Sequence, residues 1–154
     1  MGAQERGLQR EYRSDTIAVQ WEPEYCIHTA NCIRSAPAVF NPNDRPWVHS
    51  DQAPADVIAT AVLRCPTGAL HYRRLDGGAQ EPVPAITRAL PVPDGPLFLR
   101  GAIDLLDDEG NLLRHDTRMA LCRCGESRNK PFCDNTHRRS GFRDAGRVSA
   151  PAQS

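Results

Sequence analysis

Three cysteines and one histidine lie within a short stretch near the C-terminus, CRCGESRNKPFCDNTH, which runs from Cys122 to His137. One residue separates Cys122 from Cys124, eight separate Cys124 from Cys133, and three separate Cys133 from His137. Thiolates and imidazoles at such close spacing are typical metal ligands. The segment therefore has to turn back on itself so that its ligands meet. This requirement constrains the C-terminal half of the chain more strongly than any other feature.

The spacing favours two pairs of ligands. Side chains at i and i+2 of an extended segment point the same way, so Cys122 and Cys124 can both reach one metal. Asp134 is a favourable N-cap for a single helical turn, which would present Cys133 and His137 to a second metal. Two pairs suit a 2Fe–2S cluster better than a single ion. The alternative is a Cys3His zinc site, although zinc sites usually have wider spacing between cysteines.

The same stretch resembles the CDGSH (mitoNEET-like) iron–sulfur family, whose pattern is C-x-C-x2-(S/T)-x3-P-x-C-D-G-(S/A/T)-H. The matching residues are Cys122, Cys124, Ser127, Pro131, Cys133, Asp134, Thr136 and His137. Asn135 replaces the glycine, and asparagine is the residue that best tolerates a left-handed backbone after glycine. The resemblance implies a 2Fe–2S cluster with Cys122 and Cys124 on its inner iron. Cys133 and His137 would hold the outer, more exposed iron. Three further matches would support the cluster: Ser127, Pro131 and Asp134.

The other three cysteines form a second group. Five residues separate Cys26 from Cys32, and Cys65 precedes a proline. In C-x2-C-x2-C ferredoxin loops the middle cysteine would fall at Thr29. These segments resemble a divergent single-cluster ferredoxin, similar to the three-cysteine ferredoxins that serve bacterial monooxygenases. The resemblance implies a 3Fe–4S cluster on Cys26, Cys32 and Cys65. A 4Fe–4S cluster would need a fourth ligand, for which His28 is the nearest candidate, and three buried structural cysteines are the remaining alternative.

The pattern of apolar residues predicts an α+β fold with two small domains. A strand is expected at 15–21, a helix at 54–64 and an extended segment at 69–72. These elements make up a ferredoxin-like α+β domain over residues 14–76.

The second half follows a change in composition, because five prolines lie between positions 82 and 96. We therefore expect a proline-rich linker over residues 77–94. Strands are predicted at 96–106, with a bulge at Gly101, and at 111–114 and 118–121. They belong to a β-rich CDGSH-type domain over residues 95–143.

The composition indicates a soluble, cytoplasmic protein. Basic and acidic residues balance at 19 each, which argues against a nucleic-acid partner. No apolar run is long enough to cross a membrane, and the N-terminus lacks a secretory signal. Six cysteines in such a chain are expected to be reduced. Lys130 is the only lysine among the 19 basic residues, a bias that suggests a bacterial source.

No catalytic constellation is evident, since all six cysteines have an assigned role. We therefore predict an electron-transfer protein rather than an enzyme, serving a redox partner such as a reductase or an acceptor. The family resemblance suggests a homodimer. The main alternative is a redox and pH sensor or a protein that donates its cluster, and a zinc-binding interaction module is a more remote one. Arg123, Arg128, Lys130, Arg138 and Arg139 could attract an acidic partner or form a solvated rim.

Overall fold

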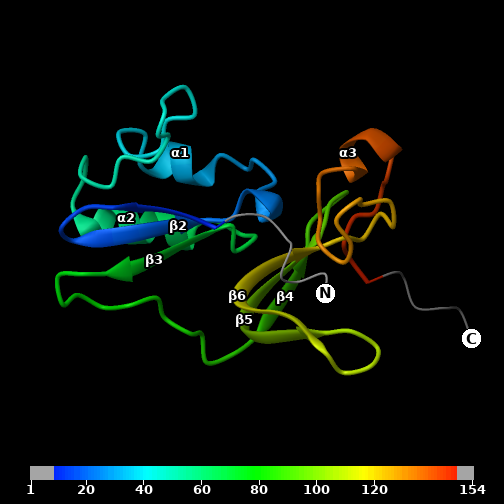
Figure 1. Ribbon diagram of the computed structural model, residues 1–154. Coiled ribbons are helices and arrows are strands. Elements are labelled where there is room, and N and C mark those ends of the chain that lie inside the picture. The colour runs from blue at the N-terminus through cyan, green and yellow to red at the C-terminus, as the bar shows by residue number, and fades with distance from the viewer. Residues whose placement is uncertain (1–8, 149–154) are drawn as a thin grey trace, which may run out of the picture.

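The computed structural model describes residues 9–148, which form two antiparallel sheets of three strands each (Figure 1). The N-terminal half contains β1 (Arg10–Arg13), β2 (Ile17–Trp21), the 3-10 turn η2 (Pro23–Tyr25), α1 (Asn31–Ser35), α2 (Ala55–Leu63) and β3 (Leu70–Arg74). The C-terminal half contains β4 (Arg88–Pro91), β5 (Leu97–Leu106), β6 (Leu112–Leu121) and α3 (His137–Ser140). The predicted α+β class is confirmed. None of the described helices is long and apolar enough to cross a bilayer.

The N-terminal sheet has the order β1-β2-β3 and includes one strand that the sequence did not indicate. β1 lies before position 14, where we expected the domain to begin, and it pairs with β2 so that Tyr12 lies opposite Val19. The predicted helix is α2, whose Ile58, Ala61 and Val62 are buried, whereas Val57, which the sequence placed in the same apolar stripe, is 44% exposed.

The C-terminal sheet has the order β4-β5-β6 and extends into the predicted linker. The linker prediction is wrong for 88–91, because β4 pairs with β5 there. An edge strand is paired on one side only and therefore tolerates Pro91 at its end. The two strands predicted at 111–114 and 118–121 are one strand, β6. β5 pairs along β6 with a register shift between Arg100 and Ile103, which contains the bulge predicted at Gly101.

The two halves share one hydrophobic core. Ile103, Met119 and Phe132 of the C-terminal half are buried in the same cluster as Ile17 of β2. Phe132 also packs edge-on against Tyr25 of η2, with ring centroids 4.8 Å apart. The halves are therefore packed against each other, although each has its own sheet.

A buried arginine fixes this packing. Arg118 of β6 is only 1% exposed, and it points into the N-terminal half. Its guanidinium donates hydrogen bonds to the carbonyl oxygens of Val62 at 2.8 Å, Cys65 at 2.8 Å and Leu70 at 2.7 Å. It also lies 3.1 Å from a carboxylate oxygen of Glu81. Because these carbonyls lie in the last turn of α2, in the segment after it and at the start of β3, Arg118 holds the corner that carries Cys65.

A charged network continues from this arginine and joins β3 to β6. His71 Nδ1 lies 2.7 Å from Glu81, and its Nε2 lies 3.1 Å from Asp116. Arg114 lies 2.7 Å from Asp116 and 3.1 Å from Glu22. Burial alone would lower the pKa of His71, but the hydrogen bonds to Asp116 and Glu81 outweigh it and raise the pKa to about 9. At neutral pH a protonated imidazole therefore lies between two carboxylates.

The raised pKa of His71 predicts a loss of stability at alkaline pH. A pKa that folding raises adds stability that is complete below the ordinary value of 6.5 and is lost as the pH rises through about 9. Between about pH 6 and about pH 10, we expect the wild type to lose roughly 2 kcal/mol more than the H71Q variant, after allowance for solvent screening. Denaturant unfolding of the anaerobic proteins across this range measures the difference. Parallel pH profiles for the two proteins would contradict the prediction.

Candidate metal centres

The C-terminal site lies at the end of β6 and in the loop that follows it. The backbone N–H of Cys122 donates to the carbonyl of Pro131 at 2.9 Å, and that of Cys133 donates to the carbonyl of Ala120 at 2.9 Å. These two bonds close the loop in the manner of a hairpin. The closure brings Cys133 back beside the end of β6.

The four predicted ligands lie in two pairs. Cys122 Sγ is 3.7 Å from Cys124 Sγ, and Cys133 Sγ is 3.6 Å from His137 Nδ1. Within residues 9–148, no three His, Cys, Asp or Glu side chains gather closely enough to hold one metal ion. The geometry therefore places the four predicted ligands as two pairs, Cys122 with Cys124 and Cys133 with His137.

Backbone amides point at all three thiols of this site. The bonds are Gly125 N to Cys122 Sγ at 3.3 Å, Glu126 N to Cys124 Sγ at 3.5 Å and Asn135 N to Cys133 Sγ at 3.4 Å. Burial raises the pKa of the Cys122 thiol, but the amides of Ser127 and Gly125 outweigh burial and lower it. Amide donors stabilise the thiolate, which is the form that binds metals.

Two of the three residues predicted to support the cluster act on the backbone through their side chains. Ser127 Oγ donates to the carbonyl of Phe132 at 2.6 Å. The carboxylate of Asp134 accepts the N–H groups of Arg128 at 2.9 Å and Thr136 at 3.0 Å. The predicted N-cap role of Asp134 is wrong, because α3 begins three residues later. Asp134 instead ties the turn after Cys133 to the preceding loop, while the third residue, Pro131, contributes its carbonyl to the loop closure.

Cys133 is more buried than the sequence suggested. Its residue is 4% exposed, whereas Cys122 and Cys124 are half-buried. Ile27 of the N-terminal half and Ala120 pack against it. The other half of the chain therefore covers the Cys133 thiol, one of the two ligands that the resemblance assigns to the more exposed iron.

The three N-terminal cysteines line one cavity of about 610 Å³. Cys26 follows η2, Cys32 lies at the start of α1, and Cys65 follows α2. Burial, together with negative charge on Cys65 and Cys26, raises the pKa of the Cys32 thiol to about 11. Three thiolates around one cavity would repel one another, so a positively charged group between them is the natural way to hold all three deprotonated.

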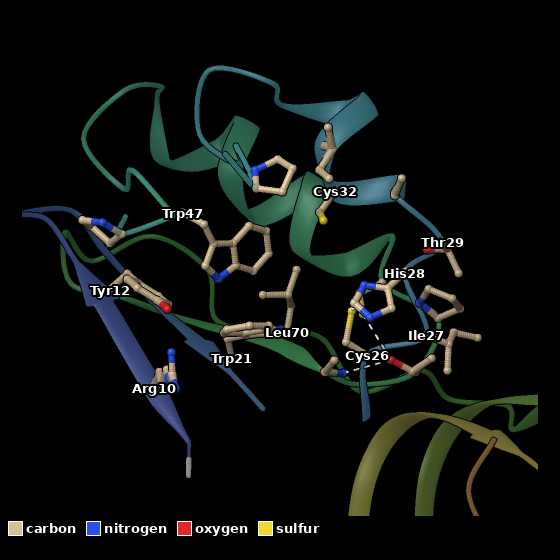
Figure 2. Close-up of a pocket in the computed structure, with 18 of the residues that line it drawn as sticks. Arg10, Tyr12, Trp21, Cys26, Ile27, His28, Thr29, Cys32, Trp47 and Leu70 are labelled. Atoms are coloured by element: carbon tan, nitrogen blue, oxygen red, sulfur yellow. Dashed lines mark hydrogen bonds between the residues drawn. The ribbon is translucent and has the colours of Figure 1, made fainter. Parts of the chain in front are cut away.

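His28, the candidate fourth ligand, lies in the same cavity (Figure 2). Its backbone is left-handed at φ 59°, and its Nδ1 is 3.8 Å from Cys26 Sγ. Thr29, which occupies the position of the missing cysteine, also lines the cavity. The predicted ligands of the N-terminal site therefore line the same cavity, and His28 lies beside Cys26 in it.

Two tryptophans line the same cavity beyond the cysteines. The indole rings of Trp21 and Trp47 pack edge-on against each other, with centroids 4.9 Å apart, and both lie further from His28 than Cys26 does (Figure 2). Within the described chain, the buried Nε1 of Trp47 has no hydrogen-bond partner, whereas the Trp21 indole faces the Cys26 thiol. A buried donor is rarely left unpaired, so Trp47 fits a bound group that has acceptor atoms, as the sulfides of an iron–sulfur cluster do. The residues around this cavity are compatible with such a group.

Comparison with known proteins agrees with both sites. A family model described as a divergent 4Fe-4S mono-cluster matches residues 12–75, and one described as an iron-binding zinc finger of CDGSH type matches residues 94–138. Protein YjdI of Escherichia coli K12, itself uncharacterized, is 33% identical over 67 residues, which make up 44% of this chain and 88% of YjdI. YjdI of Escherichia coli O157:H7 matches to the same extent. The chain belongs to the divergent 4Fe-4S mono-cluster family and carries a CDGSH-type domain.

Membership in these families makes the chain an iron–sulfur protein, and the two matched ranges contain all six cysteines and His137. The pattern did not identify Trp21 and Trp47 as cavity residues. Trp21 ends β2 just before the cysteine loop, which was an available signal, whereas Trp47 is remote from every cysteine in sequence. Arg118 was also missed, because an arginine in a strand usually faces solvent.

Proposed function

We propose that this iron–sulfur protein is a single-electron carrier rather than an enzyme, and that it works in the cytoplasm. In this proposal, Cys122, Cys124, Cys133 and His137 hold a 2Fe–2S cluster, and Cys26, Cys32 and Cys65 hold a 3Fe–4S cluster. Iron–sulfur clusters supply one-electron oxidation and reduction when bound. The unpaired state of all six cysteines suits a reducing compartment.

The observation that carries this proposal is the direct contact between the two cysteine loops. Ile27 follows Cys26 in the chain, and its side chain packs against Cys133. Its carbonyl oxygen accepts a hydrogen bond of 2.6 Å from Asn135 in the C-terminal loop. Two redox groups held by touching loops are placed for exchange of electrons, whereas two independent sites would need no such contact.

The arrangement around His28 favours a second possibility for the N-terminal site. Because His28 Nδ1 lies near Cys26 Sγ and lines the cavity, it could complete a four-ligand set for a 4Fe–4S cluster. The name of the matching family is consistent with this alternative.

A basic surface around the C-terminal site supports an acidic redox partner. The exposed side chains are Arg128, Lys130, Arg138 and Arg139. Arg123, which the sequence grouped with them, is instead half-buried and lies 3.1 Å from Asp144. Like-signed exposed charges near a redox site attract and orient a partner of opposite charge.

Metal analysis of the anaerobically purified protein tests the assignment. We expect about five iron atoms per chain with 3Fe–4S and 2Fe–2S clusters, or about six if His28 completes a 4Fe–4S cluster. The C65S variant should lose only the N-terminal cluster signal, and C124S only the C-terminal one. A colourless protein that contains zinc would contradict the proposal.

Redox behaviour distinguishes a carrier from a cluster donor. A carrier should show two reversible one-electron reductions and rapid reduction by a flavoprotein reductase. Both clusters should remain in the chain through repeated cycles. Transfer of iron and sulfide to an apo-ferredoxin at a rate faster than reduction would favour the donor role instead.

A further inference from the structure

Asn135 connects the two cysteine loops through its side chain as well as its backbone. It lies in the turn between Cys133 and His137, with a left-handed φ of 72°. Its backbone N–H donates to Cys133 Sγ at 3.4 Å, and its Nδ2 donates to the carbonyl oxygen of Ile27 at 2.6 Å. The path from Cys26 to the Cys133 thiol through these hydrogen bonds therefore contains two residues, Ile27 and Asn135.

This hydrogen bond is partly buried, and its surroundings on the Ile27 side are apolar. Ile27 is 5% exposed, and it packs with Ala120, Cys133 and Phe98. A hydrogen bond in such an environment is electrostatically stronger than one in water. The orientation of the Asn135 amide is also fixed, because a rotated amide would direct its oxygen at the carbonyl oxygen of Ile27.

The residue type adds to the argument. The signature that names the CDGSH-type domain has glycine at this position, and glycine adopts a positive φ without strain. Asparagine keeps the same turn and adds an amide long enough to reach the other half of the chain. The turn itself does not require this side chain, so a separate role is needed to account for its contact with Ile27.

We propose that Asn135 is a positioning residue that clamps the Cys26–Ile27 segment against the Cys133 turn and thereby couples the two sites. Without the clamp, the loop that carries Cys26 and His28 is held at this point only by the packing of Ile27. The electron-transfer consequence of the clamp rests on the proposed function, whereas its effect on the N-terminal loop does not. A substitution of Asn135, which belongs to the C-terminal motif, should therefore affect mainly the N-terminal site.

The N135G variant tests this inference, because glycine preserves the backbone turn and removes only the amide. We expect the C-terminal cluster to be retained in the same amount. Amide hydrogen exchange in residues 26–30 should accelerate about fivefold, as the loss of one typical hydrogen bond predicts. The N-terminal cluster should be removed faster by an iron chelator, and the magnetic interaction between the two reduced clusters should weaken.

Asn129 offers a matched control across the same contact between the halves. Its Nδ2 donates to the carbonyl oxygen of Glu24 at 3.0 Å, so N129A also removes an amide–carbonyl bond between them. We expect N129A to leave exchange in residues 26–30 near the wild-type rate. Equal acceleration in both variants, or none in N135G, would overturn the inference. If exchange accelerates only in N135G while the wild-type clusters exchange no electrons, the clamp stands and the proposed function fails.

Discussion

The R118M variant is expected to be about 3–5 kcal/mol less stable than the wild type, because it leaves buried polar groups without their partner. Arg118 satisfies the carbonyls of Val62, Cys65 and Leu70, and it lies beside Glu81. Methionine fills a similar length without a single donor. Denaturant unfolding of the anaerobic protein, followed by far-ultraviolet circular dichroism, measures the loss.

Two further variants separate the hydrogen bonds of Arg118 from charge alone. Lysine keeps the charge but cannot present the planar fork that reaches several carbonyls, so R118K should fall between R118M and the wild type. Arg13 is the surface control, since its side chain is 58% exposed and lies 3.5 Å from Glu11. R13M should change stability by less than about 1 kcal/mol. A loss in R118M no larger than that in R13M would show that the buried guanidinium does not hold the halves together.

The sequence predicts the two sites better than it predicts how they meet. The spacing of Cys122, Cys124, Cys133 and His137 already implies two pairs, because the separation is local and the backbone geometry of a few residues decides it. The left-handed backbone at Asn135 can be predicted in the same way, because asparagine tolerates a positive φ better than most residues other than glycine.

The packing of the halves could not be predicted, because the residues that produce it look like surface residues. Arg114, Asp116 and Arg118 alternate along β6, a pattern that normally indicates a face exposed to solvent. In the structure this face lies against the N-terminal half, and its charges are matched by His71 and Glu22 from that half. Pairing of this kind depends on residues that are distant in sequence, so local patterns carry no signal for it.

The burial of Cys133 has the same origin. A metal-binding loop considered alone places its last ligands at an exposed end. The side chain that covers Cys133 belongs to Ile27, which lies 106 residues before it in the sequence. The sequence thus indicates α2 and parts of both sheets, but not the contact between the halves, which changes the environment of the ligands. The sites should be tested in the intact chain for this reason.

The G68A variant is expected to be about 3 kcal/mol less stable than the wild type and to lose the N-terminal cluster first. Gly68 has a φ of 73°, and a Cβ there would overlap the backbone oxygen of Arg118 and the carboxylate of Asp116. Neither group can move easily, since one is backbone and the other is held by His71 and Arg114. Unfolding measurements give the loss of stability, and the visible spectrum reports the cluster.

Gly110 provides the control that isolates the overlap from the backbone strain. Its φ of 87° is equally unfavourable for alanine, but a Cβ there would meet no atom within 4 Å. G110A should therefore cost only about 1 kcal/mol and leave both clusters in place. The additional loss in G68A then measures the contact between the halves. It should appear at Cys65, because β6 touches the N-terminal site at the Cys65–Gly68 corner. Equal losses in the two variants would mean that β6 does not position this corner.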